Sequence, residues 1–424
     1  MNNTKFIEKL LDGVDVEWRA LGSLGDLVRG NGLQKKDFTE SGVPAIHYGQ
    51  IYTYYGLSTT ETKSFVSLDL AKQLKKVDQG DVVITNTSEN LEDVGKSLVY
   101  LGKHQAVTGG HATILKPGKC LLGKYFAYLT QTDHFASEKR KYAKGTKVID
   151  VSATDMAKIS IPVPCPDNPK KSLEIQARIV RVLDAFAELT AELTAELTAE
   201  LTARKKQYNY YRDQLLSFEE GVVEWRTVGE IFDLKNGYTP SKANADYWTN
   251  GEVPWFRVED IRTNGRVLRS AIQRVSASAV KGKLIPFNSL IMSTTATLGE
   301  HALIEIPFLI NQQITSFTVS KNYENKVDMK FMFHYFFIFG KWCSENANKN
   351  GGMGIIGLPK LKQFEVPVPA LAEQARIVAI LDKFDALTCS LTEGLPREIE
   401  LRQKQYEHYR DLLLNFPKPE AVEV

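Results

Sequence analysis

One short stretch of the chain gathers side chains that could bind a polyanion. Residues 139–147 contain five Lys or Arg side chains around Tyr142. Basic side chains contact phosphate oxygens, and a neighbouring ring can stack on a base. A solvated charged surface explains each residue taken singly just as well. We predict that this run contacts nucleic acid through Lys139, Arg140, Lys141, Tyr142 and Lys144.

A second group consists of side-chain amides at Asn311-Gln312-Gln313. Such amides can pair with the N6/N7 edge of adenine in the major groove. Amides that cap a strand end are the commoner case. The matching place in the first half of the chain is Thr108-Gly109-Gly110-His111. Different loop chemistry on equivalent frames is expected if each half reads different bases.

Polar loops also follow two strand-like runs, where binding residues often lie. Residues 86–88 follow the run 80–85, and residues 294–295 follow the run 289–292. Tyr48, Tyr52, Tyr54 and Tyr55 either stack on a ligand or belong to a core. The further residues predicted to contact nucleic acid are Lys35, Lys36, Asn86, Thr87, Ser88, Gly109, Gly110, His111, Tyr238, Lys242, Thr294, Thr295, Asn311, Gln312, Gln313, Lys349 and Asn350.

Motifs that would indicate catalysis are missing from the sequence. Gly95-Lys96-Ser97 ends like a phosphate-binding loop, but the glycine expected five positions earlier is Asn90. HExxH, GxSxG and GxGxxG are absent, and so is an Asn-Pro-Pro-Tyr-type motif that grips a flipped base. The four Cys and seven His lack metal-ligand spacing. We therefore expect no catalytic residue and no metal site, so a catalytic function would need an unrecognised site.

The composition is that of a globular protein. The chain has 424 residues, and 53 Lys+Arg minus 51 Asp+Glu gives a net charge of +2. This length favours two or three domains. The most apolar run, Phe331 to Phe339, is far shorter than the roughly 20 residues of a membrane span. The first 20 residues lack the apolar region of a signal peptide. We expect a cytoplasmic protein with reduced thiols and no membrane contact.

The chain repeats itself, which determines how its elements are arranged. Val16-Glu17-Trp18-Arg19 recurs at 223–226, followed at equal distances by Leu27 or Leu234 and Gly30 or Gly237. A Pro-x-Pro segment at 161–164 recurs at 366–369, and Gln176-Ala177-Arg178-Ile179-Val180 recurs at 374–378. Both halves close on Lys-Gln-Tyr, and the interval from Gln to Gln is 31 residues in each (207 − 176 and 405 − 374). The repeat therefore constrains length as well as composition.

A long helix is expected in each half. Residues 172–217 lack Pro and Gly and are rich in helix-forming residues, with Ser172 a plausible N-cap. Four tandem Ala-Glu-Leu-Thr units occupy residues 187–202. A period of four on an α-helix drifts by about 40° per unit, so the Leu stripe must rotate. In the second helix, Gly394-Leu395-Pro396 should cause a kink. Antiparallel pairing would bury both stripes better than two separate surface helices.

The two variable blocks mix strand-like and helical segments. Strands are expected near 80–85, 112–115, 289–292 and 314–317, and helices near 123–130 and 329–342. We therefore predict an α+β protein in which two mixed α/β domains form a pseudo-two-fold repeat, joined by two long antiparallel coiled-coil helices. The predicted parts are residues 1–165 and 219–369 for the domains, and 166–218 and 370–424 for the helices with the C-terminal tail.

Two variable blocks, each followed by a repeated helix with tandem Ala-Glu-Leu-Thr units between them, resemble the specificity subunit of Type I restriction–modification systems. The resemblance covers nearly the whole chain. It implies that each block is a target recognition domain for one half of a bipartite, asymmetric double-stranded DNA site. It also implies that the helix pair sets the spacer and docks two methyltransferase subunits, which restriction subunits join.

The resemblance also implies a non-catalytic chain. S-adenosylmethionine, ATP and Mg²⁺ would be held by the partner subunits, and none by this chain. Three alternatives stay open at this point: a free-standing bipartite DNA-binding or bridging protein without methyltransferase partners, a nuclease or methyltransferase with a concealed site, and a coiled-coil scaffold unrelated to DNA. Co-purification with a methyltransferase subunit, S-adenosylmethionine binding, and salt-sensitive DNA affinity would separate them.

Overall fold

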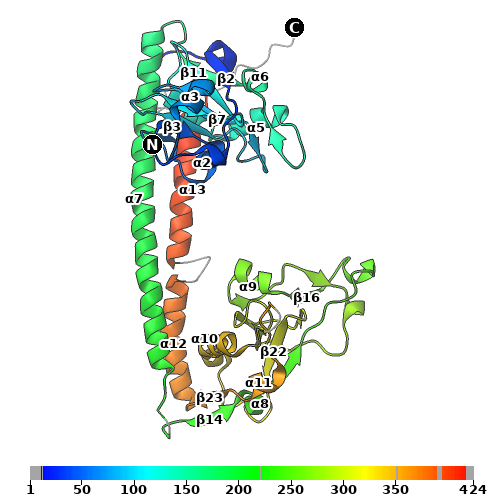
Figure 1. Cartoon of the computed structure of the whole chain (residues 1–424). Coiled ribbons are helices and arrows are strands. Elements are labelled where there is room, and N and C mark those ends of the chain that lie inside the picture. The colour runs from blue at the N-terminus through cyan, green and yellow to red at the C-terminus, as the bar shows by residue number, and fades with distance from the viewer. Residues whose placement is uncertain (1–10, 12, 220, 350–351, 389–393, 417–424) are drawn as a thin grey trace. The chain divides into compact units, whose positions relative to one another are not determined.

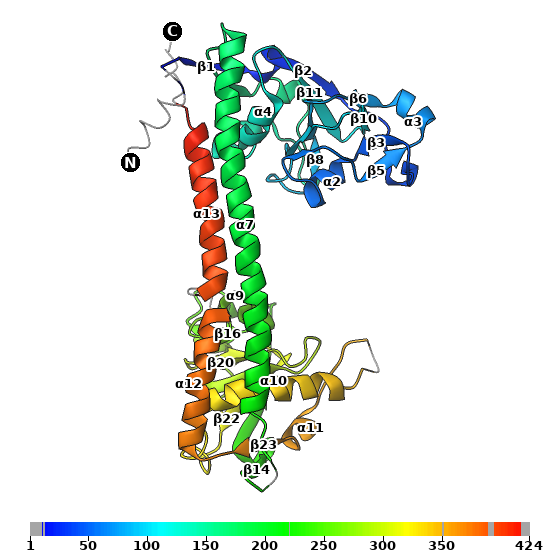
Figure 2. The same cartoon turned by 90° about the vertical axis from the view of Figure 1, so that its left-hand side faces the viewer.

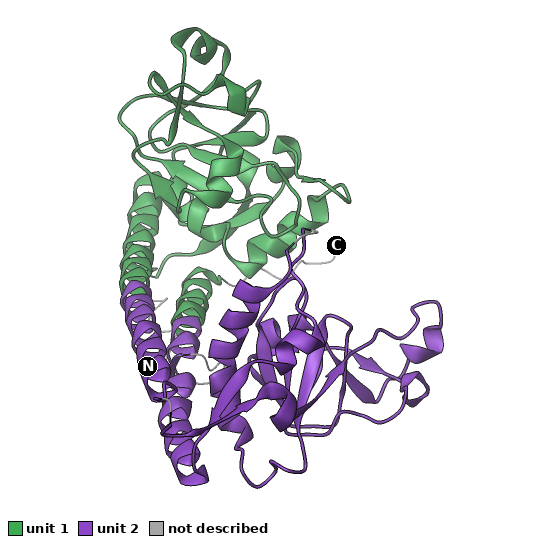
Figure 3. Cartoon of the chain, turned by 60° about the horizontal axis from the view of Figure 1, so that its bottom comes forward, with its two compact units in different colours: residues 1–192, 402–424 green, residues 193–401 purple. Residues whose placement is uncertain are grey.

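A computed structural model describes residues 11, 13–219, 221–349, 352–388 and 394–416. Contacts divide the chain into two compact units (Figure 3): unit 1 is residues 1–192 with 402–424, and unit 2 is residues 193–401. The predicted domain boundaries follow the sequence, whereas these units cut through both long helical regions. Each unit therefore combines one globular part with a segment from each helical region.

The globular part of unit 1 contains two main sheets (Figure 1). The five-stranded sheet has the order β2-β11-β7-β9-β4, with β2 (Gly25–Arg29), β4 (Ser58–Thr59), β7 (Val82–Thr85), β9 (Ser97–Tyr100) and β11 (Ala112–Pro117). The four-stranded sheet has the order β5-β3-β10-β6, with β3 (Val43–Ile46), β5 (Ser64–Val66), β6 (Lys75–Val77) and β10 (Ala106–Thr108). A short pair joins β8 (Thr87–Ser88) to β12 (Ile149–Asp150). The helices are α2 (Tyr48–Thr53), α3 (Leu68–Gln73), α4 (Gly123–Leu129), α5 (Asp133–Tyr142) and α6 (Ala153–Met156).

Unit 2 repeats this arrangement. Its five-stranded sheet has the order β15-β22-β19-β20-β17, with β15 (Phe232–Asn236), β17 (Val267–Leu268), β19 (Ser289–Ser293), β20 (His301–Ile304) and β22 (Ile314–Val319). The smaller sheet has the order β18-β16-β21, with β16 (Val253–Phe256), β18 (Arg274–Val275) and β21 (Leu309–Ile310). The helices are α8 (Val228–Ile231), α9 (Val258–Asn264), α10 (Met329–Asn346) and α11 (Leu358–Lys362). The predicted strands and helices of both blocks are confirmed.

The first two repeated motifs pair with each other in both units. β1 (Val16–Ala20) runs antiparallel to β13 (Ser160–Pro164), with Trp18 opposite Pro162. β14 (Glu224–Thr227) runs antiparallel to β23 (Glu365–Val368), with Trp225 opposite Pro367. Proline cannot donate to a sheet ladder, so it suits a strand in a two-stranded pair. The Val-Glu-Trp-Arg and Pro-x-Pro segments thus close each globular part where the chain enters a helix.

The first long helix, α7 (Pro169–Leu215), has 47 residues. It begins three residues before the predicted start, because Asn168 supplies the cap: its Oδ1 accepts from the backbone N–H of Lys171 at 3.2 Å. Pro169 suits the first helical position, where no N–H is needed. The prediction of Ser172 as the N-cap is wrong. Ser172 is buried inside the helix, and its hydroxyl accepts from Gln176 Nε2 at 3.0 Å.

The second helical region consists of α12 (Leu371–Thr388) and α13 (Gly394–Leu414), separated by residues that lie outside the described ranges. In unit 1 the rings of Phe186 and Tyr409 lie 6.0 Å apart, and in unit 2 those of Tyr211 and Phe384 lie 5.7 Å apart. The residue numbers have one sum (186 + 409 = 211 + 384 = 595), as expected for one antiparallel register. Figures 1 and 2 show α7 running beside α12 and α13, which confirms the antiparallel pair.

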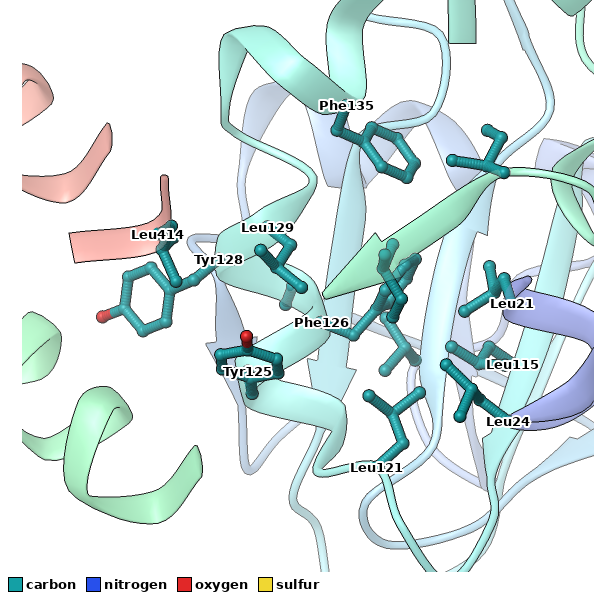
Figure 4. Packing of buried hydrophobic residues seen from close by; sticks show 14 of the residues in the cluster. Leu21, Leu24, Leu115, Leu121, Tyr125, Phe126, Tyr128, Leu129, Phe135 and Leu414 are labelled. Carbon is teal, nitrogen blue, oxygen red and sulfur yellow. The ribbon is translucent and has the colours of Figure 1, made fainter. Parts of the chain in front are cut away.

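The core of each unit includes helical residues from distant parts of the sequence. In unit 1, Ile175, Ile179 and Leu183 of α7 are buried with Leu413 and Leu414 in the cluster that also contains α4. Figure 4 shows Leu414 beside Tyr128 and Leu129 of α4. In unit 2 the corresponding cluster joins α10 to residues of α12 and to Tyr208 and Leu216, near the end of the first half of the chain. Each globular part is therefore packed onto its helices through shared apolar contacts.

The Ala-Glu-Leu-Thr segment of α7 is weakly packed. Its Leu193, Leu197 and Leu201 are half-buried, while Leu189 is 52% exposed. The hydroxyls of Thr198 and Thr202 donate to carbonyls four residues earlier, at 2.7 and 2.8 Å. Within the described ranges, no helix is both long and apolar enough to span a bilayer.

Candidate nucleic-acid interface

The small sheet of each unit contains one parallel strand pair whose carboxyl ends place two loops together. β3 and β10 are parallel in unit 1, and β16 and β21 are parallel in unit 2. Residues that directly follow these strands must therefore meet at one edge, although they are far apart in the sequence. This edge is a common place for ligand-binding side chains in parallel sheets.

In unit 1 this edge carries imidazole and tyrosine rings. The Tyr48 ring lies 4.6 Å from the ring of His47 and 4.7 Å from that of His111. Thr87 Oγ1 lies 2.9 Å from His111 Nδ1, so a predicted loop residue joins the same group. We call Lys35, His47, Tyr48, Thr87 and His111 the strand-end face of unit 1. Sequence analysis identified Lys35, Thr87 and His111, left Tyr48 open and missed His47.

Electrostatics at this face favour a neutral His47. Burial lowers the pKa of His47, and electrostatic interactions with Lys35 and His111 lower it further. The backbone N–H of Gly49 donates to His47 Nδ1 at 3.1 Å, which requires an unprotonated Nδ1. His111, by contrast, is exposed. The face therefore offers a neutral imidazole whose remaining nitrogen can donate.

In unit 2 the equivalent edge carries an arginine and amides. Arg257 follows β16, and Asn311 and Gln312 follow β21. A cavity of about 660 Å³ opens there, and its lining includes Lys242, Trp248, Trp255, Arg257, Asn311 and Gln312. We call these six residues the strand-end face of unit 2. Sequence analysis found Lys242, Asn311 and Gln312 but missed Arg257 and the two tryptophans.

Hydrogen bonds hold the amide loop of unit 2 in place. Asn311 Nδ2 donates to Gln313 Oε1 at 3.2 Å, and the Gln313 backbone N–H donates back to Asn311 Oδ1 at 3.1 Å. The hydroxyl of Thr239 donates to Gln312 Oε1. Asn311 and Gln313 therefore fit the commoner alternative, in which amides cap a strand end. Gln312 instead is exposed at the rim of the cavity.

The repeated Gly30 and Gly237 allow these loops to approach closely. A Cβ on Gly30 would lie 2.2 Å from the carbonyl oxygen of Gly109, and a Cβ on Gly237 would lie 2.1 Å from that of Asn311. Both distances are far below van der Waals contact. Any side chain at either glycine would therefore displace the loop that follows the parallel strand.

A buried glutamine anchors each globular part to its helix. In unit 1, Gln176 Oε1 accepts from the backbone N–H of Leu122 and its Nε2 donates to the carbonyl of Cys120, both at 2.8 Å. In unit 2, Gln374 Oε1 accepts from the N–H of Asp328 at 2.7 Å and its Nε2 donates to the carbonyl of Lys326 at 2.8 Å. Both side chains are fully buried. The repeated Gln-Ala-Arg-Ile-Val motif thus has a structural role at the start of α4 and α10.

Near each of these glutamines, an aspartate of the long helical region binds a lysine and one further side chain. That further side chain is a tyrosine in unit 1 and a histidine in unit 2. In unit 1, Lys124 and Tyr128 of α4 donate to the carboxylate of Asp184 on α7, at 2.8 and 2.7 Å. In unit 2, Lys330 donates to Asp382 at 2.7 Å, and His334 Nε2 lies 2.9 Å from the same carboxylate. Burial would raise the pKa of Asp382, but the bonds from His334 and Lys330 bring it below its ordinary value.

Comparison with known proteins identifies the family. The family model described as "Type I restriction modification DNA specificity domain" matches residues 13–203 and 222–401. The specificity subunit of the Type I restriction enzyme EcoR124I/EcoR124II from Escherichia coli is 40% identical over 435 residues, covering 100% of both chains. The chain belongs to the family of Type I restriction–modification specificity subunits.

Further relatives agree with this assignment. The specificity subunit of the Type I restriction enzyme EcoprrI from Escherichia coli is 45% identical over 219 residues, which are 50% of this chain and 54% of that one. A chain from a solved structure of a type I R-M system matches the fold with a TM-score of 0.69 and 15% identity, covering 94% of this chain and 97% of its own. The predicted fold class is thereby confirmed.

The sequence of this specificity subunit predicted that the basic run at residues 139–147 contacts nucleic acid. In the structure the run does not form one exposed surface. Lys139 is buried, and its ammonium donates to the carbonyls of Glu92 and Val94 at 3.2 and 2.5 Å. Burial lowers the pKa of Lys139 to about 8. A Cβ on Gly95 would lie 2.8 Å from Lys139 Cδ, so this glycine makes room for the lysine stem. Lys139 therefore ties down the loop before β9 and does not face solvent.

The other residues of the run remain at the surface. Arg140, Lys141 and Lys144 are exposed, and Tyr142 is half-buried. Lys141 pairs with Glu138 at 2.8 Å, and Lys144 pairs with Asp155 at 3.0 Å. Hydrogen bonds from Lys158 and Lys144 lower the pKa of that aspartate. In the specificity subunit these cations remain candidates for phosphate contacts, although two of them already have acidic partners.

Two further predicted residues are buried. Asn86 is fully buried, and neither amide atom has a hydrogen-bond partner among the described residues. Thr294 is buried, and its backbone N–H donates to the carbonyl of Gln313 at 2.9 Å. Both were predicted to contact nucleic acid from polar loops after strands, but their burial leaves little of either side chain accessible to a ligand. Gly109 is also buried, against Leu33.

The remaining predicted residues lie near the two faces or on the surface. Tyr238 is half-buried, donates its hydroxyl to the carbonyl of Ala279 at 3.0 Å, and accepts a Trp255 indole bond on its carbonyl, also at 3.0 Å. Thr295 bridges to Ile355, and Ile355 bridges to Asn348, which precedes exposed Lys349. Asn350 lies outside the described residues. Lys36 is exposed, and Ser88 and Gly110 are half-buried.

Within the described part of the chain, no three His, Cys, Asp or Glu side chains lie close enough together to bind a metal ion. The rejected phosphate-loop match at Gly95-Lys96-Ser97 leads into strand β9, whose first residue is Ser97, and not into a helix. It therefore lacks the strand-to-helix context of that motif.

Proposed function

We propose that this specificity subunit directs methylation and restriction to a bipartite double-stranded DNA site. Each strand-end face would read one half of the site, and the exposed cations around it would contact phosphates. The chain itself would catalyse no reaction. S-adenosylmethionine, ATP and Mg²⁺ would be held by two methyltransferase subunits and by restriction subunits, as the resemblance implies.

One observation carries the proposal: the two units share a sheet order but carry different chemistry at the same strand ends. A pair of identical faces would read a symmetric site. One face built on imidazole and tyrosine and one built on arginine and amides favour two unlike half-sites. A good bidentate contact to one base contributes about 1–3 kcal/mol of discrimination, so each face needs few residues.

The helix pair would set the distance between the half-sites. The selectivities of two linked readers multiply when the separation and phase between them are restricted. α7 is continuous over 47 residues and contributes to both units. One Ala-Glu-Leu-Thr unit adds about 6 Å of helix, which corresponds to between one and two base pairs, and about 40° of rotation. The half-buried Leu stripe of this segment also leaves apolar surface for partner subunits.

Deletion of one repeat unit tests the spacer role. We expect a chain lacking residues 191–194 to direct its methyltransferase subunits to sites with a shorter gap and unchanged half-site sequences. The measurement is sequencing of methylated adenines in cells that carry the chain with its methyltransferase subunit. Leu193→Ala in the full-length chain is the matched control, because it removes the same leucine and keeps the length. A deletion that leaves the gap unchanged would contradict the spacer role.

A further inference from the structure

We propose that Arg257 is a specificity-determining residue of unit 2, which reads the major-groove edge of a guanine in one half-site. The assignment rests on the proposed function, and it deepens it by naming a side chain and the base it recognises. Guanine presents two acceptors, O6 and N7, in the major groove, and a bidentate arginine is the commonest partner for them.

The backbone beneath Arg257 is held in one position. Its N–H donates to Asp260 Oδ2 at 2.8 Å, and the other oxygen of Asp260 accepts from the N–H of Ile272 at 2.6 Å. Asp260 is fully buried. One carboxylate therefore ties the start of α9 to the loop before β18. A side chain that starts from such a fixed point loses little conformational freedom on binding.

The guanidinium of Arg257 is oriented but still accessible. One terminal nitrogen pairs with Glu259 at 2.8 Å, and the group lies 5.8 Å from the centre of the Trp255 ring. The side chain keeps 30% of its surface exposed. The Nε of Arg257 is buried, so the donors available to a ligand are those of the terminal nitrogens. A planar guanidinium held by a carboxylate and an aromatic ring presents these donors in a fixed direction. This geometry suits an acceptor pair such as O6 and N7.

The cavity beside Arg257 lacks the carboxylates that line two other cavities. Its described lining contains Lys242 and Arg257 and no carboxylate. The lining of the cavity of about 850 Å³ in unit 1 includes Glu92, Asp93 and Asp133 together with two lysines and an arginine. The lining of the cavity of about 640 Å³ in unit 2 includes Asp382 and Asp385 together with a lysine and three arginines. Of these three cavities, the strand-end cavity of unit 2 is the one whose described lining presents cations without a carboxylate, which suits an electron-rich edge.

Two tryptophans make the wall of this cavity rigid. The rings of Trp248 and Trp255 meet edge to face with centres 5.2 Å apart. The indole N–H of Trp248 donates to the carbonyl of Ser241, and that of Trp255 donates to the carbonyl of Tyr238. Both rings are thus fixed by packing and by a hydrogen bond. They restrict where a base edge can approach Arg257.

The equivalent position in unit 1 carries His47, which is buried and lacks a fixed positive charge. A neutral imidazole cannot donate twice to O6 and N7. The inference is therefore specific to unit 2, and it predicts that the half-site read by unit 1 does not depend on Arg257.

The test compares wild-type, Arg257→Ala and Arg257→Lys chains, each assembled with its methyltransferase subunits. Methylated sites are sequenced, and binding to duplexes with single base changes is measured at several salt concentrations. We expect Arg257→Ala to lose discrimination of about 5- to 150-fold at one guanine position in one half-site, with the salt slope nearly unchanged. Arg257→Lys should also relax that position, because lysine lacks the bidentate fork.

Arg269→Ala is the matched control. Arg269 also pairs with a glutamate, Glu305, but it is exposed and does not line this cavity. Its loss should leave the recognised sequence unchanged. Thermal unfolding of the three variants shows whether folding is affected, and the lysine variant tests the role even where the alanine variant is destabilised.

Several results would overturn the assignment. Uniform weakening on all sequences, with a salt slope reduced by about one, would make Arg257 a phosphate contact. Relaxation at a position other than guanine, or an unchanged methylated sequence, would also exclude it. These outcomes differ from failure of the proposed function, in which the wild-type chain itself would show no bipartite methylated sequence.

Discussion

The strand-end faces of unit 1 and unit 2 occupy the same place in the same sheet order, yet their side chains differ in kind. Unit 1 carries His47, Tyr48 and His111, whereas unit 2 carries Arg257 and Gln312 against two tryptophans. The surrounding frame is repeated down to Gly30 and Gly237, which let the loops approach. The comparison shows that the frame positions the loops and that their side chains are free to vary.

The anchors behind the faces show the opposite behaviour. Gln176 and Gln374 make the same two bonds to backbone groups at equivalent places, and the Asp–Lys pair near each glutamine recurs. Tyr128 is replaced by His334, and the carboxylate contact is kept. Groups that satisfy buried backbone atoms tolerate little change, since an unpaired buried donor or acceptor is costly.

The largest expected effect comes from removing an anchor. Gln374→Ala should leave three backbone groups unpaired, because Gln374 also donates to the carbonyl of Pro369 at 2.7 Å. We expect a loss of roughly 2–4 kcal/mol in local opening free energy around residues 326–336. Hydrogen exchange of the intact chain measures it. Gln176→Ala removes the side-chain partner of two backbone groups. It should therefore lower the local opening free energy around residues 120–130 by less.

Gln403→Ala is the control for both anchor variants. Gln403 is exposed on α13 and bonds to Glu407, so its loss should change exchange by far less. Equal exchange in all three variants would show that the glutamines do not anchor the globular parts.

A second, smaller effect is expected on the salt dependence of DNA binding, where the exposed Arg140 and the buried Lys139 of unit 1 should differ. Arg140→Ala should lower the salt slope of DNA binding by up to about 0.9, as expected for one lost phosphate contact. Lys139→Met should leave the slope unchanged and increase hydrogen exchange in residues 89–94, because Lys139 holds that loop. If the salt slope of DNA binding falls in both variants, Lys139 also contacts phosphate and its assignment as a purely structural residue is wrong.

The smallest effect concerns the imidazole of His47. Its folded pKa is lowered, so the folded protein resists protonation, and stability falls as the pH drops from 6.5 through the folded value. We expect Lys35→Ala to raise the pKa of His47 by removing a like charge, as measured by NMR of labelled histidines. Lys36→Ala is the control. If Lys35→Ala leaves the titration midpoint of His47 unchanged, the charge of Lys35 does not influence the pKa of this histidine.

Much of the fold followed from the sequence, because repeated segments and helix-forming composition are local signals. The antiparallel helices agree with expectation, whereas the pairing of the Val-Glu-Trp-Arg and Pro-x-Pro motifs appears only in the structure. The predicted start of α7 was three residues too late, because the N-terminus of the helix depends on a single capping side chain, that of Asn168. At the two strand-end faces, the sequence indicated the loops after strands as candidates, but His47 and Arg257 carried no signal of their own.

The sequence by itself determined that two dissimilar blocks are built on one repeated plan, since spacing and composition are properties of the chain alone. Only the tertiary structure decided which side chains meet. Parallel pairing of β3 with β10 and of β16 with β21 brings together residues more than 50 positions apart (311 − 257 = 54). Packing likewise buried Lys139 and Asn86, because the burial of a polar group depends on neighbours that linear spacing does not reveal.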